Sequence, residues 1–232
     1  MSDYVVVDKE QLEADLTIVA DSIRAKSGGT EPLVFPDGFV SEIDGIAAGG
    51  NDSMFMAMIE GDFSDFELPD EVTKIRPYAF YECTNLCLKS LPDGMTRIEQ
   101  YTFYECDNNA LTELPTGITF IGSYAFYNNA KLTLTNLPDS ISEIGTNAFF
   151  YCTLIKIERI PASMQKINSG SFMGCKGITS LTFEGTPTTI ASNAFSSCTN
   201  LTTINVPWAE NEVSKAPWGA TNATINYNYT GE

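Results

Sequence analysis

A period of 23 residues runs through most of this chain. Phenylalanine recurs at this spacing six times, at Phe80, Phe103, Phe126, Phe149, Phe172 and Phe195. Two further apolar series keep the same period, one at Ile75, Ile98, Ile121, Ile144, Ile167 and Ile190 and one at Leu68, Leu91, Leu114, Leu137, Ile160, Phe183 and Val206. Such repetition is typical of solenoids, in which each turn buries its apolar side only by stacking on its neighbours. We therefore expect a solenoid of six regular 23-residue turns.

Cysteine forms another series with the same period, and asparagine takes one of its positions. The members are Cys83, Cys106, Asn129, Cys152, Cys175 and Cys198. Neighbouring turns lie about 5 Å apart, which is within reach of a disulfide, but side chains in such a ladder run parallel and point inward. The pattern favours buried free thiols. A disulfide between neighbours or with Cys87, and a metal site, are the alternatives, although no C-x-x-C pair supports zinc.

The period continues into a divergent seventh turn. The positions one period after Ile190, Phe195, Ile204 and Val206 are Val213, Trp218, Tyr227 and Tyr229. Larger aromatic side chains can cover the open end of a stacked core, as a terminal cap must. We therefore divide this part of the chain into repeats at 63–206 and a divergent seventh turn with the C-terminal cap at 207–232.

The repeat unit resembles the BspA-type leucine-rich repeat, which is also found in treponemal surface proteins. The unit that begins at Leu137 and ends with Ala148 and Phe149 shows the pattern, which the family writes as C-x-x-L-x-x-I-x-L-P-x-x-L-x-x-I-x-x-x-A-F. The resemblance covers about residues 63–229. It implies a leucine-rich-repeat solenoid of the α+β repeat class, and a role in adhesion or protein interaction, often on bacterial surfaces.

One departure from the pattern concerns the strand of each turn. Four early turns place an apolar residue one position sooner than turns five and six do, at Leu88, Leu111, Leu134 and Ile157. Because side chains alternate across a strand, a bulge or a similar irregularity must absorb this shift. The sheet face of turns one to four should therefore differ from that of turns five and six. Its polar pairs are candidate binding residues, with an ordinary solvated face as the alternative: Lys89, Ser90, Thr112, Glu113, Thr135, Asn136, Glu158 and Arg159.

Two aromatic series flank the inner phenylalanines. One consists of Tyr78, Tyr101 and Tyr124, and the other of Tyr81, Tyr104, Tyr127 and Phe150. Their spacing places them partly outward, on the turn opposite the main sheet. Rings at strand spacing can stack on sugar faces or on an aromatic partner, which makes both series candidate binding residues. The alternative is that the rings only stack on one another and shield the backbone.

We expect residues 1–48 to form a separate N-terminal segment, followed by a linker and N-terminal cap at 49–62. Leu12, Leu16, Val19 and Ile23 recur at helical spacing, which predicts a helix over 8–26. The runs 22–29 and 35–39 resemble a small module of tail-associated proteins from phages and prophages of Gram-positive bacteria. This resemblance implies an attachment role in a virion. The alternative is a small helical cap packed on the solenoid.

Composition excludes several classes of function. The net charge is −17 and lysine and arginine are not clustered, so neither nucleic acid nor an anionic membrane is an expected partner. The chain contains no histidine, which excludes His-based catalysis and metal binding. No signal peptide precedes the repeats, and no stretch of about 18 apolar residues occurs, so we expect no membrane insertion.

These observations predict a non-catalytic module without cofactors that binds a protein or a cell-surface glycan. The alternative is a structural protein of a phage or prophage tail that uses residues 1–46 for assembly. The expected location is virion-associated or cytoplasmic, and the cell surface is expected only by a non-Sec route. Paired carboxylates could in principle hydrolyse glycosides, but a chain with 30 acidic residues always contains such pairs.

Overall fold

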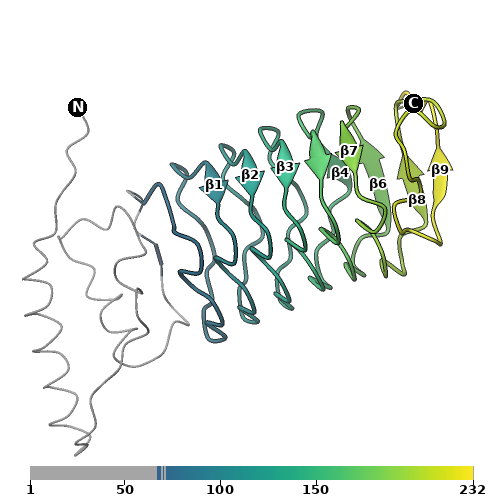
Figure 1. Ribbon diagram of the computed structural model, residues 1–232. Coiled ribbons are helices and arrows are strands. Elements are labelled where there is room, and N and C mark those ends of the chain that lie inside the picture. Colours follow the sequence, from purple (N-terminus) through teal and green to yellow (C-terminus); the bar gives the residue numbers. More distant parts are fainter. Residues whose placement is uncertain (1–66, 69, 71, 232) are drawn as a thin grey trace, which may run out of the picture.

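The computed structural model describes residues 67–68, 70 and 72–231 (Figure 1). In this part the chain winds through successive turns that stack side by side from the N-terminal to the C-terminal end. The expected solenoid of stacked turns is therefore confirmed. No helix occurs among the described residues, and the predicted helical segment at 1–48 and the linker and cap at 49–62 lie outside them.

Two parallel sheets run along the stack, and most of their strands are only two residues long. One sheet has the order β1-β2-β3-β5-β7, with strands Arg97–Ile98, Phe120–Ile121, Glu143–Ile144, Lys166–Ile167 and Thr189–Ile190. The other has the order β4-β6-β8-β9, with strands Arg159–Ile160, Ser180–Phe183, Thr203–Asn205 and Thr224–Asn226. We call them the first and second sheet. The first sheet pairs in a register of 23 residues, so each isoleucine lies beside the next isoleucine of its series.

The six phenylalanines form a continuous stack in the centre of the core. Every ring is fully buried, and neighbouring centroids lie 5.3–5.5 Å apart with the rings nearly parallel. Isoleucines and leucines of the other periodic series surround the stack and are buried as well. The prediction of inward apolar ladders is therefore confirmed.

The cysteine series also points inward, as its spacing predicts. Each buried thiol donates a hydrogen bond to the carbonyl of the phenylalanine 26 residues earlier, at 2.9–3.0 Å from Cys106, Cys152, Cys175 and Cys198. Asn129 replaces the thiol with its amide, which donates to Phe103 O at 2.6 Å. The thiols are free and hydrogen-bonded to the backbone, so the ladder ties each turn to the one before it.

The second sheet begins only in the fourth turn, which corrects the position expected for the main sheet. In β6 the residues alternate between half-buried and buried, as a regular strand requires. In the second turn, Leu111 and Leu114 are buried while Thr112 and Glu113 between them are both exposed. Two consecutive outward residues interrupt the alternation, and no strand forms there. The expected difference between early and late turns is thus confirmed, but in turns one to three the predicted sheet face belongs to irregular backbone.

The seventh turn caps the core, but with a different register from the one predicted. Thr203, Ile204 and Asn205 pair with Thr224, Ile225 and Asn226, a shift of 21 residues and not 23. Tyr227 is therefore only half-buried and Tyr229 is exposed. The expectation for Trp218 is confirmed, because its indole is fully buried. Trp208, which the period did not indicate, joins it. The ring centroids of Trp208 and Trp218 lie 5.2 and 6.1 Å from that of Phe183.

Candidate binding surfaces

The two outer aromatic series form one continuous surface of stacked rings. Within each column, neighbouring rings lie 4.6–4.7 Å apart and are parallel to within 11°. Between the columns, rings of the same turn lie 5.7–5.9 Å apart and are tilted. We call this the tyrosine surface, and it consists of Tyr78, Tyr81, Tyr101, Tyr104, Tyr124, Tyr127 and Phe150. Tyr78 and Tyr81 are 46% and 40% exposed, and the other five are half-buried.

The tyrosine surface lies on the turn that directly follows each strand of the first sheet. Backbone N–H groups of this turn donate to carbonyls of the next turn, for example Tyr78 N to Gln100 O at 3.2 Å and Phe80 N to Thr102 O at 2.9 Å. Side chains on the two sides of this row of backbone hydrogen bonds therefore point in opposite directions. Phenylalanine enters the core, while the tyrosines before and after it remain at the surface.

The backbone of this turn takes a conformation that bulky residues rarely adopt. Tyr78, Tyr101 and Tyr124 have φ of 67°, 57° and 60°. A left-handed conformation costs about 1–2 kcal/mol for a residue with a side chain. Later turns use residues that tolerate it better, namely Asn147 and Gly170, at the same position. The early turns therefore keep tyrosine where asparagine or glycine fits the backbone more easily.

Carboxylates line the edge of the tyrosine surface. Loss of hydration raises the pKa of Tyr81, and a hydrogen bond to Glu82 raises it further. The pKa of Tyr104 rises to about 12, again mainly through loss of hydration, with the Glu105 carboxylate as the next cause. Glu82 and Glu105 also have positive φ, at 56° and 53°. Phenol hydroxyls and carboxylates thus lie together along two successive turns.

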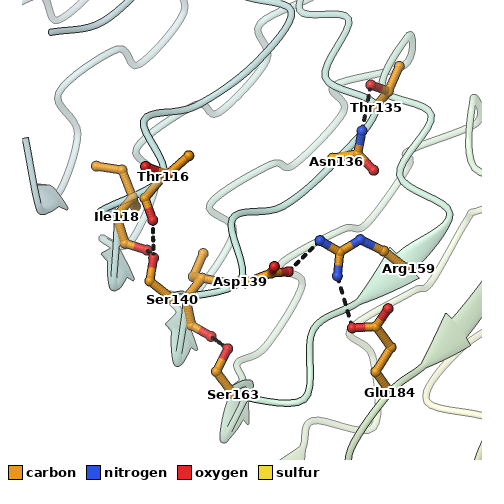
Figure 2. A network of polar contacts seen from close by, with 10 residues as sticks. Thr116, Ile118, Thr135, Asn136, Asp139, Ser140, Arg159, Ser163 and Glu184 are labelled. Atoms are coloured by element: carbon orange, nitrogen blue, oxygen red, sulfur yellow. Dashed lines mark hydrogen bonds and ion pairs between the residues drawn. The ribbon is translucent and has the colours of Figure 1, made fainter. Parts of the chain in front are cut away.

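A second candidate surface is an open hollow of about 560 Å³ beside the start of the second sheet. Its polar lining comes from three successive turns and includes Thr112, Glu113, Thr116, Thr135, Asn136, Asp139 and Arg159. Figure 2 shows Arg159 reaching from β4 between two carboxylates. Its guanidinium donates to Asp139 and, at 2.9 Å, to Glu184. These two acids of different turns fix the cation at the rim of the hollow.

Serine and threonine hydroxyls tie neighbouring turns together next to this hollow. Ser140 shares its one hydroxyl hydrogen between the carbonyls of Thr116 and Ile118, at 2.7 and 2.6 Å, and Ser163 donates to Ile141 O at 2.6 Å (Figure 2). Asn136 donates to its neighbour Thr135 at 3.2 Å. The backbone beneath the hollow is therefore held by side-chain hydrogen bonds where no strand forms.

The hollow brings together five of the eight residues predicted for the sheet face. These are Thr112, Glu113, Thr135, Asn136 and Arg159. The other three, Lys89, Ser90 and Glu158, are exposed but do not line it. Only Arg159 belongs to a strand. Asp139 was not predicted, because it follows the proline of the next turn and only the winding of the chain places it beside Arg159.

The outward face of the first sheet was also missed by sequence reasoning. Arg97 lies 4.1 Å above the ring centroid of Phe120, and Lys166 Nζ lies 3.7 Å from a carboxylate oxygen of Glu143. The sequence signal that could have revealed this face is the residue directly before each isoleucine of the periodic series, because side chains alternate across a strand. These pairs lie on the outward, solvent-facing side of the first sheet, where such pairs contribute little to stability.

Two features are absent from the described residues. No group of three or more His, Cys, Asp or Glu side chains is placed so that it could hold a metal ion. No helix among these residues has the length and apolar character needed to cross a membrane.

Comparisons with solved structures find leucine-rich repeat proteins. A leucine-rich repeat protein of T. pallidum is 30% identical, with a TM-score of 0.49 over 58% of this chain and 63% of that one. One from Bacteroides ovatus is 18% identical, with a TM-score of 0.44 over 69% of this chain and 59% of that one. A leucine rich cell surface protein of Faecalibacterium prausnitzii is 19% identical, with a TM-score of 0.29 over 70% of this chain and 65% of that one.

The chain therefore spans less than two thirds of the length of each of these structures. A comparison with curated proteins finds no match. The model of the BspA type leucine rich repeat region matches residues 51–176 and 155–218, in six copies. This match covers most of the chain and agrees with the stacked turns, so the chain belongs to the BspA-type leucine-rich repeat family.

Proposed function

We propose that the protein is a non-catalytic recognition module that binds a protein or a glycan through the tyrosine surface. The observation that carries this proposal is the retention of seven partly exposed rings in two columns over four successive turns. Tyrosine offers a large contact area with a polar group at its tip, which suits a surface that is wet when free and dry when bound.

Backbone conformation supports a role beyond folding. Stacked rings at the surface contribute about 0.5–1.5 kcal/mol per pair, which is similar to the cost of the positive φ at Tyr78, Tyr101 and Tyr124. The tyrosines of the first column, Tyr78, Tyr101 and Tyr124, therefore add little net stability over asparagine, which the chain uses at the equivalent position Asn147. Their persistence is explained better by contact with a partner than by stability.

The test replaces one tyrosine column with the residue that the sixth turn already carries there. The variant combines Tyr81→Ser, Tyr104→Ser and Tyr127→Ser, and the matched control changes the hollow by Thr112→Ala, Thr135→Ala and Asn136→Ala. Binding of the fluorescently labelled full-length chain to Gram-positive cells, matrix proteins and a glycan array is measured by flow cytometry and array fluorescence. We expect the column variant to lose binding while the control retains it.

If the hollow variant loses binding while the column variant retains it, the hollow is the binding site. If both variants bind as the unchanged chain does, neither surface is the binding site. A cooperative thermal unfolding transition in both variants serves as the folding control. Serine is compatible with this turn, because Ser196 already occupies the equivalent position.

A role in a phage or prophage tail is the alternative, and it is supported by the resemblance of runs 22–29 and 35–39 to tail-associated proteins. These residues lie outside the described part of the chain. The two roles are compatible, because a tail protein can carry the recognition module. A chain without residues 1–48 that still binds the same cells would place recognition on the solenoid, and loss of assembly with tail proteins would assign the segment its attachment role.

A further inference from the structure

The stacking of the tyrosine surface restricts what it can bind. Tyr101, Tyr104 and Tyr127 each have a parallel ring on both faces, at 4.6–4.7 Å. A sugar that stacks on an aromatic side chain needs a free ring face, and these three rings have none. These three rings can therefore present only their edges and phenol oxygens to a partner.

Carboxylates supply the second element of the surface. Glu82 and Glu105 directly follow Tyr81 and Tyr104 in the chain, and after loss of hydration their carboxylates are a further cause of the raised pKa of these two phenols. Asp107, two residues beyond Glu105, is exposed on the same turn. Lys131 is already engaged, since its ammonium donates to Asn108 Oδ1 at 2.6 Å. Phenol and carboxylate oxygens therefore accept hydrogen bonds from a ligand here, and a cationic donor gains most from them.

The carboxylates of the tyrosine surface narrow the choice of occupant. Glu82, Glu105 and Asp107 belong to its turns, so a second copy of the same surface would bring acid against acid. The whole chain is acidic as well, with a net charge of −17. An acidic peptide or anionic glycan meets the same repulsion. A basic protein segment gains from the long-range field as well as from the local carboxylates.

We propose that the tyrosine surface binds a lysine- or arginine-bearing segment of a partner protein, with Glu82 and Glu105 as the anionic contacts. The aliphatic stems of lysine or arginine lie against the ring edges while the cationic head reaches the carboxylates and phenol oxygens. This inference rests on the proposed function and specifies its ligand class.

The test uses two synthetic 12-residue peptides and one neutral sugar as probes: alternating Lys-Thr, alternating Gln-Thr, and cellohexaose. Titration calorimetry measures their binding to the full-length chain in 50 and 300 mM NaCl. The variant Glu82→Gln with Glu105→Gln removes the charge of the two contacts. The control Asp93→Asn with Glu210→Gln removes the same charge from exposed residues of other turns.

We expect the Lys-Thr peptide alone to bind, and to bind more weakly in 300 mM NaCl. The Glu82→Gln, Glu105→Gln variant should lose about five- to tenfold in affinity, as expected for two exposed charge pairs, and the control less than twofold. The Tyr81→Ser, Tyr104→Ser, Tyr127→Ser variant should lose peptide binding altogether.

Three results would overturn this inference. Equal losses in both charge variants would assign binding to net charge alone. Cellohexaose binding that depends on the tyrosines would leave the recognition role intact while replacing the ligand class. Absence of binding by the Lys-Thr peptide would refute the cationic ligand, and if the tyrosine variant also keeps all binding to cells, matrix proteins and glycans, the proposed function fails with it.

Discussion

At the scale of single residues, two asparagines occupy positions where other turns place apolar or thiol groups. Asn109 is fully buried at the position of Leu86, Leu132 and Ile155, and neither atom of its amide has a hydrogen-bond partner among the described residues. Asn129 donates to Phe103 O, but its own oxygen is unpaired. A buried polar group without a partner destabilises the fold, so Asn109, with both amide atoms unpaired, should lower the stability of the repeat.

The substitution Asn109→Leu should therefore raise the free energy of unfolding by about 1–3 kcal/mol, because it removes an unpaired amide and restores the apolar ladder. Urea denaturation followed by fluorescence measures the change. The neighbouring Asn108 is the matched control, since its amide donates to Thr84 O and accepts from Lys131. Asn108→Leu should lower stability, and a gain from both substitutions would contradict the role of the unpaired amide.

At the scale of structural elements, side-chain ladders and backbone hydrogen bonds outside the strands add to the few bonds of the short strands in holding the turns together. Strands of two residues supply few hydrogen bonds. The cysteine ladder adds one bond per turn from a buried thiol to a phenylalanine carbonyl. Burial raises the pKa of Cys152 to about 12 and that of Cys198 to about 11, against an ordinary value of 9.0. The thiols stay protonated, and hence remain donors, up to strongly alkaline pH.

The raised pKa values of the Cys152 and Cys198 thiols predict that the folded chain loses stability at alkaline pH. In the unfolded chain the thiols ionise near pH 9, whereas in the folded chain they resist ionisation until about pH 11 to 12. Their contribution is therefore complete below about pH 9 and is lost as pH rises from there, at up to about 1.4 kcal/mol per thiol and pH unit. Urea midpoints between pH 8 and 10.5 measure it.

The matched variant combines Cys152→Ser and Cys198→Ser, in which the hydroxyl can donate to the same carbonyl without ionising. Its midpoint should fall less steeply with pH than that of the unchanged chain. Parallel pH profiles would show that the alkaline loss comes from other groups, such as the tyrosines.

At the scale of the whole molecule, the solenoid is a one-dimensional stack whose end must be closed. Trp208 and Trp218 lie 6.2 Å apart at 69° and cover Phe183 at the C-terminal end. Trp218 also donates its indole N–H to Ser214 O at 2.8 Å. Because each turn contacts only its neighbours, damage at this cap should spread inward from the end and not through the whole stack.

We therefore expect Trp218→Ala to cost about 3–5 kcal/mol in the seventh turn and to expose the core beneath it. Hydrogen exchange followed by mass spectrometry should show faster exchange in 195–229 and unchanged exchange in 75–126. Uniform acceleration over all turns would show instead that the solenoid unfolds as a single cooperative unit.

Much of the fold was accessible from the sequence because burial follows residue type at a repeated position. Phe126 is buried and Tyr127 is half-buried, and the period alone separates them into core and surface. The inward cysteines, the stacking of both tyrosine columns and the capping role of Trp218 follow from the same reasoning. The candidate residues of the tyrosine surface were therefore predictable one by one.

Tertiary structure alone decided how neighbouring turns pair and which polar residues meet. The 21-residue register of β9, the absence of a second-sheet strand in turns one to three and the approach of Asp139 to Arg159 depend on backbone hydrogen bonds between turns. Likewise, only the 4.6–4.7 Å stacking shows that the inner tyrosine faces are closed. Periodicity determines whether a side chain faces the core or the solvent, because burial depends on the position within one turn. Which residues become its neighbours depends on the backbone hydrogen bonds between that turn and the next.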